Sequence, residues 1–373
     1  MKIEEVITPH KHEPQQHDET SALKYLKASR IILPVVIGLS VVVWLIIRQL
    51  DMETIRKFDF NIHTFFWISM AAFMYISRHL FYSWRLRIIT DYAFSWLKAM
   101  QLIIIWEFST AVSPTSVGGA GVALFLLSKE KMSGAKTISV VLYSMVIDTI
   151  FFVTALIILA LTIGPIMVRP GMQSFSDIDG YGITFLTVLM FMVAYGSMFF
   201  YGLFINPGAI KRLLIFLSRL RIASRFKKPL RTIAFDVVTT SAEIKNKPFR
   251  FHVGAFLCTM GAWTTRFLAI NCLIMAFVPE VYRTLADQAT IFARAMAMHT
   301  IEAFSPTPGA AGVIEFLFGG FFSDFIPASM AVIIVVLWRI FGYYSYLLAG
   351  VIIVPLWLKN IVRQKKETQN LNA

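Results

Sequence analysis

The stretch SPTSVGGAGV at residues 113–122 recurs, one residue shorter, as SPTPGAAGV at residues 305–313. Each copy interrupts a long apolar segment, and a shorter apolar segment follows it. Proline followed by small residues ends a regular helix, because proline lacks the backbone donor and glycine is a weak helix former. At membrane depth, broken backbone is tolerated only where protein or a wet cavity covers it. Two matched breaks therefore indicate a transport site.

The composition around these stretches is that of a polytopic membrane protein. Of the 373 residues, 57% are hydrophobic and 15% are charged, which is unlike a soluble domain. Several apolar runs are long enough to cross a bilayer. The formal net charge of +13 is explained by basic cytoplasmic loops, so nucleic acid is not expected as a partner. Cys258 and Cys272 are expected to pack in an apolar segment.

The charge pattern predicts the topology. The basic regions are expected on the cytoplasmic side, and they are 24–30, 85–87, 129–136, 206–250 and 359–366. The loops 164–181 and 279–288 each carry one Arg against two acids, which places them outside. The two basic regions that flank 95–128 share a side only if this segment enters the membrane and returns. By the same reasoning, 286–322 enters from the outside.

The predicted fold is an all-α polytopic membrane protein built as an inverted repeat, with about six full spans plus two re-entrant helical hairpins. One hairpin enters from each face. We expect the cytoplasmic (inner) membrane as the location, with both termini in the cytoplasm. The expected parts are a disordered cytoplasmic tail at 1–23, a single transmembrane domain at 24–358 with repeat halves at about 24–165 and 180–358, and a basic cytoplasmic tail at 359–373.

Segment 206–250 is a basic insertion with partly helical periodicity. A basic amphipathic helix beside membrane spans usually lies on the anionic cytoplasmic surface. We therefore expect membrane lipids as partners, with 206–250 on an anionic lipid surface. A homo-oligomer is compatible with the sequence.

A shared offset extends the repeat beyond the two breaks. Gly121 and Gly312 are 191 residues apart, and Asp148 and Arg339 are separated by the same number. The offset favours a pair between Asp148 and Arg339 across the pseudo-twofold axis, either as a structural ion pair or as a gating pair. A second, similar match relates the short sequences around Arg78 and Arg266.

Each break is expected to open a short helix whose N-terminus points toward the bilayer centre. Free backbone N–H groups and the helix dipole favour an anion there, such as a lipid phosphate. The alternative is that the breaks are hairpin turns packed closely in protein. The candidate substrate-binding residues are Gly118, Gly119, Gly121, Asp148, Arg266, Glu302, Gly309, Gly312, Glu315 and Arg339, and the structural breaks are Pro114, Pro306 and Pro308.

Charges inside apolar segments need a partner or a wet cavity, because each costs roughly 2.5–3.5 kcal/mol at mid-bilayer. Arginines match phosphate oxygens, and carboxylates accept an ammonium group. Arg78 is expected to reach toward the interface, while Glu107 has no assigned role. His299 lies one turn before Glu302 on the same helix face. Glu315 serves equally well as a helix cap. Tyr343, Tyr344 and Tyr346 are expected to pack or to anchor an interface, not to bind ligand.

Enzyme motifs are absent from the sequence: it contains no Walker sequence, no HExxH and no CxxC. The glycines at 118–121 do not follow a strand, so they are no dinucleotide fingerprint. Asp148 has no partner aspartate in a second span, as an intramembrane aspartyl protease would require. We therefore expect no catalytic residue, no metal site and no cofactor, and transport that is passive or driven by a gradient.

The two SPT-type breaks with GGxG and GxxGxxE, together with Trp338-Arg339, resemble the lysylphosphatidylglycerol synthase transmembrane-region family over about residues 25–358. This is the flippase domain of the multiple peptide resistance factor. The resemblance implies re-entrant helices and translocation of a lipid or lipid-linked substrate. The chain looks like a stand-alone member that lacks the aminoacyl-transferase domain. The matching positions are Pro114, Gly118, Gly119, Gly121, Asp148, Pro306, Pro308, Gly309, Gly312, Glu315 and Arg339.

The family often has a Glu-Arg pair shortly before the position of Asp148, where this chain has Ser144 and Met145. The head-group is therefore left open. The first hypothesis is a lipid flippase-like transporter, which predicts a polar cavity between the breaks. The alternatives are a non-transporting lipid-binding or accessory protein for cell-envelope lipid or glycolipid synthesis, with a dry interior, and an intramembrane enzyme on polyprenyl lipids, with a nucleophile or metal cluster.

Overall fold

The computed structural model describes residues 60–112, 116–130, 132–174, 180–219, 231, 234–235, 238, 241–278, 284–302, 305, 310 and 313–371. The expected tail at 1–23, the first expected span at 31–50 and much of the basic insertion lie outside these residues. Within them, all regular structure is helical. The all-α fold class is thereby confirmed.

The first half contains a long helix, a helical hairpin and a second long helix. Their bounds are α4 at Ile62–Ile89, α5 at Trp96–Val112, α6 at Ser116–Lys129 and α7 at Gly134–Ile163, followed by the short 3-10 helix η1 at Pro165–Met167. The side chains of Asn61 and Ser133 cap α4 and α7 by accepting backbone N–H bonds. α7 ends at Gly164, whose φ of 79° suits glycine.

The second half repeats this order after an additional span and a short surface helix. The bounds are α8 at Gly180–Phe200, the π-helical η2 at Tyr201–Ile205, α9 at Pro207–Leu217, α11 at Phe249–Phe277, α12 at Leu285–Glu302, α13 at Val313–Phe321, α14 at Ala328–Arg339, the π-helical η5 at Ile340–Tyr344 and α15 at Ser345–Leu371. α13 begins at Val313, the last residue of the second stretch. α6 begins at Ser116, inside the first stretch, so Gly118, Gly119 and Gly121 are helical, although they were expected to belong to a broken segment.

Four helices in the described part are long and apolar enough to cross a membrane, and they span Lys136–Ile163, Gly182–Ile205, Phe249–Phe277 and Met330–Ile361. α4 is of similar length, but Arg78, Arg85 and Arg87 interrupt its apolar sequence. The protein is therefore an all-α, multi-pass membrane protein. The expected number of about six full spans stays a prediction.

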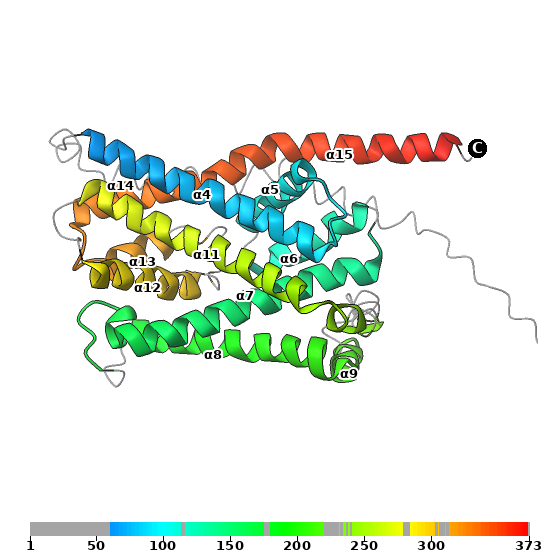
Figure 1. Ribbon diagram of the computed structural model, residues 1–373, viewed down its shortest axis with the longest axis horizontal. Coiled ribbons are helices and arrows are strands. Elements are labelled where there is room, and N and C mark those ends of the chain that lie inside the picture. Colours follow the sequence, from blue (N-terminus) through cyan, green and yellow to red (C-terminus); the bar gives the residue numbers. More distant parts are fainter. Residues whose placement is uncertain are drawn as a thin grey trace, which may run out of the picture.

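The packing follows the pattern of a repeat. α4 and α11 lie along each other in opposite directions through the middle of the molecule (Figure 1). α4 packs on α5 as α11 packs on α12, and α6 packs on α7 as α13 packs on α14. α5 packs on α15, just as α12 packs on α7. Exchanging the two halves leaves these neighbours unchanged, which is the relation that an inverted repeat requires.

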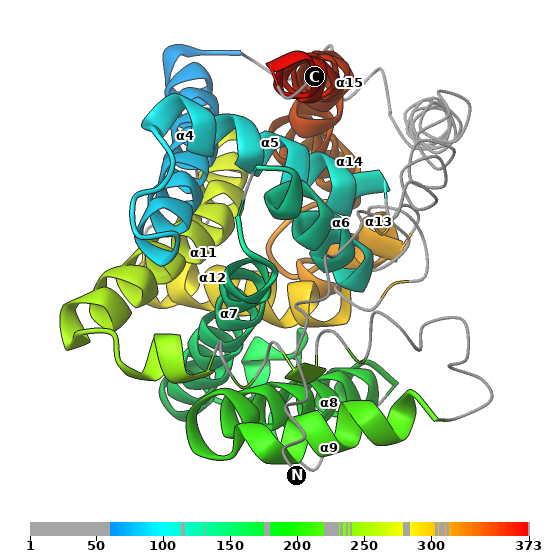
Figure 2. The ribbon, with the colours of Figure 1, turned by 90° about the vertical axis from the view of Figure 1, so that its right-hand side faces the viewer.

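The two hairpins lie toward opposite ends of the helix bundle. Figure 1 shows α12 and α13 toward the end where α4 begins, and α5 and α6 toward the end where it finishes. α9 lies across the end of α8, at the end of the molecule where α7 begins (Figures 1 and 2). The end view in Figure 2 also shows α4 and α11 as one wall, with α8 and α9 on another side.

Asp91 connects the end of α4, the start of α7 and the segment before α11 at one end of the bundle. It follows α4 with a left-handed φ of 55°, and its carboxylate accepts bonds from Lys136 at the start of α7 and from Lys247 just before α11, the latter at 2.6 Å. Partial burial raises the pKa of Asp91, but the two lysine hydrogen bonds outweigh burial and leave the pKa below its ordinary value. The regions near 85–91, 136 and 247 thus meet at one end, as the basic pattern predicted.

Arg294 plays the corresponding role at the opposite end. Its side chain is fully buried in α12. It donates to the carbonyl oxygen of Ile166 at 2.9 Å, to that of Phe321 at 3.1 Å, and to Asp324 at 2.5 Å. The second hairpin is thereby attached to the loop after α7 and to the turn before α14.

Labelling of engineered cysteines is expected to place these two ends on opposite sides of the membrane. Ala93→Cys and Ser323→Cys both fall at exposed positions, and the native Cys258 and Cys272 are buried. A membrane-impermeant maleimide should reach position 93 only from the cytoplasmic side and position 323 only from outside. The unsubstituted protein is the control and should label weakly from either side. Labelling of both positions from one side would contradict the opposed hairpins.

Candidate functional site: a charged cavity between the two hairpins

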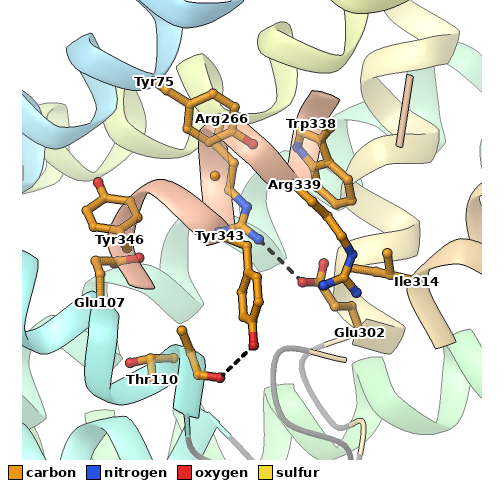
Figure 3. A pocket seen from close by; sticks show the side chains of 12 residues that line it. Tyr75, Glu107, Thr110, Arg266, Glu302, Ile314, Trp338, Arg339, Tyr343 and Tyr346 are labelled. Carbon is orange, nitrogen blue, oxygen red and sulfur yellow. Dashed lines mark hydrogen bonds and ion pairs between the residues drawn. The ribbon is translucent and has the colours of Figure 1, made fainter. Parts of the chain in front are cut away.

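A cavity of about 110 Å³ lies among α4, α5, α11, the ends of α12 and α13, and the α14–η5–α15 helix (Figure 3). It is lined by Tyr75, Glu107, Thr110, Ala111, Arg266, Glu302, Ile314, Trp338, Arg339, Gly342, Tyr343 and Tyr346. The last turn of α5 comes directly before the first break, and Glu302 and Ile314 flank the second. The cavity therefore lies at the helix ends that adjoin the two breaks, has two arginines and two glutamates in its wall, and has room for several water molecules.

One ion pair connects the first long helix to the first hairpin. Arg78 of α4 donates to Glu107 of α5 at 2.8 Å and to the hydroxyl of Tyr346 at 3.2 Å. Its guanidinium also lies over the rings of Tyr82 and Tyr346. Arg78 is 1% exposed, so the expectation that it reaches the interface is wrong. The reason is that α5 brings Glu107 within bonding distance, which compensates the buried charge.

A second ion pair makes the same connection in the other half. Arg266 of α11 contacts Glu302 of α12 at 3.4 Å, and His299 bonds the other oxygen of Glu302 at 2.8 Å. His299 and Glu302 share one helix face, as their spacing predicted. Each half thus places an Arg–Glu pair between its long helix and the first helix of its hairpin. Glu107, which had no assigned role, is the acid of the first pair.

Arg339 reaches the cavity where α14 gives way to the π-helical η5. The residue is 3% exposed, and its guanidinium lies 5.3 Å from the ring centre of Tyr343. In Figure 3 the guanidinium groups of Arg266 and Arg339 both point toward Glu302. The hydroxyl of Tyr343 donates to the carbonyl oxygen of Ala111 at 3.3 Å, which ties η5 to the end of α5. Short π-helical turns inside α-helices are frequent at functional sites.

Gly342 allows this arrangement. A Cβ atom at this position would lie 2.6 Å from the hydroxyl oxygen of Tyr75, which is too close for any other residue unless the Tyr75 side chain moves. Tyr343 and Tyr346, which the sequence assigned to packing, line the cavity. The signal that was available is their spacing from Arg339, since residues three to four apart share a helix face.

Asp148 lies outside the cavity. It accepts bonds from Arg85 at 2.6 Å and from the indole N–H of Trp263 at 2.8 Å. The expected pair between Asp148 and Arg339 is therefore wrong. Residues at equivalent positions of a repeat occupy similar places in their own halves, but they need not contact each other. Because α7 packs on α11, Asp148 faces Arg85 and Trp263. Arg85 is itself buried, although the charge pattern assigned it to a cytoplasmic loop.

The remaining predicted site residues do not line the cavity in the described part of the chain. Gly118, Gly119 and Gly121 belong to the first turns of α6, and Gly121 is exposed. Glu315 belongs to the first turn of α13. Their binding roles stay predictions, as do those of Pro114, Pro306, Pro308, Gly309 and Gly312, which lie outside the described residues. The part of the chain that the structure covers contains no His, Cys, Asp and Glu group that could hold a metal ion.

The fold and the cavity define a multi-pass α-helical membrane protein in which opposed hairpins enclose a charged interior site. The chain belongs to the Lysylphosphatidylglycerol synthase TM region family, whose sequence profile matches residues 31–350. It is also similar to a UPF0104 membrane protein of Archaeoglobus fulgidus, with 21% identity over 296 residues that cover 76% of this chain and 84% of the relative. No solved structure matches the chain.

Proposed function

We propose that the protein is a flippase-like transporter that moves the head-group of a phospholipid or lipid-linked molecule across the cytoplasmic membrane. Alternating access between the two halves would expose the cavity to each side in turn. The observation that carries this proposal is the cavity between the hairpins, with Arg266 and Arg339 in its wall. Fixed guanidinium groups replace the water that a phosphate loses on leaving the membrane surface.

The charges around the cavity favour an anionic ligand. Arg266 and Arg339 stand in the cavity wall beside Glu107 and Glu302, and the buried Arg78 adds a third guanidinium next to Glu107. Charges inside a membrane bundle are costly unless a partner, a ligand or water compensates them. Guanidinium groups bond phosphate oxygens in pairs, which makes a phosphate head-group a suitable ligand for this wall.

The described part of the basic insertion supports cytoplasmic termini and an anionic lipid surface. α9 carries Lys211 and Arg212 beside an exposed Phe216, and Lys211 lies 4.2 Å from the ring centre of Phe235. Such a helix at the end of a membrane bundle suits an anionic leaflet. We include this orientation, with both termini in the cytoplasm of the inner membrane, in the proposal.

Reconstitution in liposomes tests the proposal. The wild-type protein should move fluorescent phospholipids or polyprenyl phosphates between leaflets, and Arg339→Ala should slow this movement by roughly 10- to 100-fold, because one charged hydrogen-bonding group contributes about 1.5–3 kcal/mol. Arg363→Ala is the matched control, since Arg363 is 78% exposed on α15 and far from any cavity residue in sequence. Each variant is first checked for a monodisperse elution profile.

Movement of no lipid by the wild-type protein would overturn the transport proposal. Lipid binding without movement would favour the accessory-protein hypothesis. Covalent change of a polyprenyl lipid would favour the enzyme hypothesis.

A further inference from the structure

The carboxylate of Glu302 is shared by two basic groups of different strength. His299 Nδ1 lies 2.8 Å from one oxygen, whereas Arg266 lies 3.4 Å from the other. The equivalent pair in the first half, Arg78 and Glu107, is 2.8 Å apart, and the neighbouring His79 contacts the Tyr346 hydroxyl at 3.2 Å. Arg266 is thus held more weakly than its counterpart. Its Nε atom is buried and has no hydrogen-bond partner in the described residues.

His299 lies among three aromatic rings, and a guanidinium nitrogen of Arg266 lies 3.5 Å from its Nδ1. Its ring centre lies 5.0 Å from that of Trp263, 5.7 Å from that of Phe152 and 5.7 Å from that of Phe267. Aromatic faces attract cations, and Glu302 lies within hydrogen-bond distance of Nδ1. Histidine is also the side chain whose ordinary pKa allows its charge to change between about pH 5 and 8.

The geometry points to a proton-controlled latch: we propose that protonation of His299 takes Glu302 away from Arg266 and releases the Arg266 guanidinium to bind the anionic head-group in the cavity. A neutral His299 leaves Arg266 with a carboxylate partner. A charged His299 forms a full ion pair with Glu302, so two cations then compete for one carboxylate. The inference rests on the proposed function, because the ligand is the same lipid phosphate.

Other charged groups near the latch do not reverse its direction. Arg78 of α4 and Arg339 of α14 act on His299 and Glu302 from the neighbouring helices, and both arginines stay charged throughout this range. The tyrosines of α8 also keep their protons there. Asp148 of α7, a helix that also packs on α12, accepts a bond from Trp263, whose ring centre lies 5.0 Å from that of His299. These groups set the midpoint of the transition, while acidification still favours release of Arg266.

The coupling works in both directions, because linkage between two sites is reciprocal. Acid should tighten anion binding, and anion binding should draw a proton onto His299. A purely structural histidine would produce neither effect. The latch therefore connects lipid binding to proton concentration through a contact inside the cavity wall.

Calorimetric titration of the purified protein with dihexanoyl phosphatidylglycerol tests the latch. We expect about tenfold tighter binding near pH 5.5 than near pH 7.5, with uptake of up to about one proton per lipid, measured in buffers of different ionisation enthalpy. His299→Gln should bind equally at both pH values. Glu302→Gln should bind at the higher pH as tightly as the wild type binds at the lower one, because Arg266 is released at any pH. His252→Gln is the control, since His252 bonds Tyr143 away from the cavity, and it should keep the wild-type response.

Equal wild-type affinity at both pH values, or a full pH response in His299→Gln, would overturn the latch. If this occurs while the wild type still moves lipid in liposomes, the latch alone is wrong. If the wild type neither binds nor moves lipid at either pH, the latch and the transport proposal are both wrong. An elution profile like that of the wild type shows that each variant is folded, and Glu302→Gln tests the latch independently if His299→Gln does not fold.

Discussion

Glu107→Gln is expected to lower the free energy of unfolding by about 3–5 kcal/mol, because it leaves a buried guanidinium without its carboxylate. Arg78 is 1% exposed. After the change, its partners would be a neutral amide oxygen at position 107, the Tyr346 hydroxyl at 3.2 Å and two aromatic rings. None of these carries a compensating negative charge. Denaturant titration in mixed micelles, followed by tryptophan fluorescence, measures the effect.

A double variant separates the cost of the isolated charge from the value of the pair. Removing both charges with Arg78→Met and Glu107→Met should recover most of the lost stability, because an apolar pair leaves no buried charge. Glu367→Gln is the surface control, since it breaks an exposed pair with Arg363, and its effect should be at most about 0.5 kcal/mol. If Glu107→Gln changes stability no more than this control does, Arg78 has another carboxylate partner or access to water.

Arg294→Met is expected to cost about 2–4 kcal/mol, because the loss of one buried side chain removes the donor from two carbonyl groups and from Asp324. The Phe321 residue, whose carbonyl oxygen accepts one of these bonds, is fully buried. The substitution also disconnects α12 from the loop after α7 and from the turn before α14. The temperature of unfolding in detergent, read by size-exclusion fluorescence, should fall accordingly.

Two control variants separate the loss of a positive charge from the loss of the buried hydrogen bonds of Arg294. Arg294→Lys keeps the positive charge but lacks the planar guanidinium that bonds both the Ile166 and Phe321 carbonyl oxygens. Its unfolding temperature should therefore lie between those of the wild type and Arg294→Met. Arg363→Met removes an exposed arginine on α15 and should leave the unfolding temperature unchanged. An Arg294→Met protein that unfolds at the wild-type temperature would show that this anchor does not hold the second hairpin.

Loop charges and sequence repeats carried most of the fold prediction. Basic residues around 85–87 and 129–136 required a returning hairpin, and α5 and α6 form it. The break sequences predicted that a second hairpin helix follows Pro114 and Pro308, because proline acts on local backbone, but α6 begins at Ser116 and includes the glycines that were expected to interrupt it. The cavity was also expected between the breaks. The first span and the break residues 113–115, 306–309 and 311–312 lie outside the described part, so those expectations are still open.

The individual contacts of the site were harder to predict. Arg78 and Glu107 are 29 residues apart, and Arg85 and Asp148 are 63 apart. No local pattern relates them. Glu107 was found among the buried charges but had no partner, and Arg78 was expected at the interface. The shared offset matched Asp148 with Arg339 as repeat equivalents, but the two residues do not pair. Asp148 pairs with Arg85 instead.

The sequence by itself determined that this chain is a multi-pass helical protein with two opposed hairpins, because apolar length, loop charge and helix-breaking residues act locally and each has its own signal. Only the tertiary structure decided which buried charges meet. Partner choice depends on the rotation of α4, α5, α7, α11 and α12 about their own axes, and that rotation is set by side-chain packing between segments far apart in the chain. It placed Arg266, Glu302 and Arg339 around one cavity and turned Asp148 away from it.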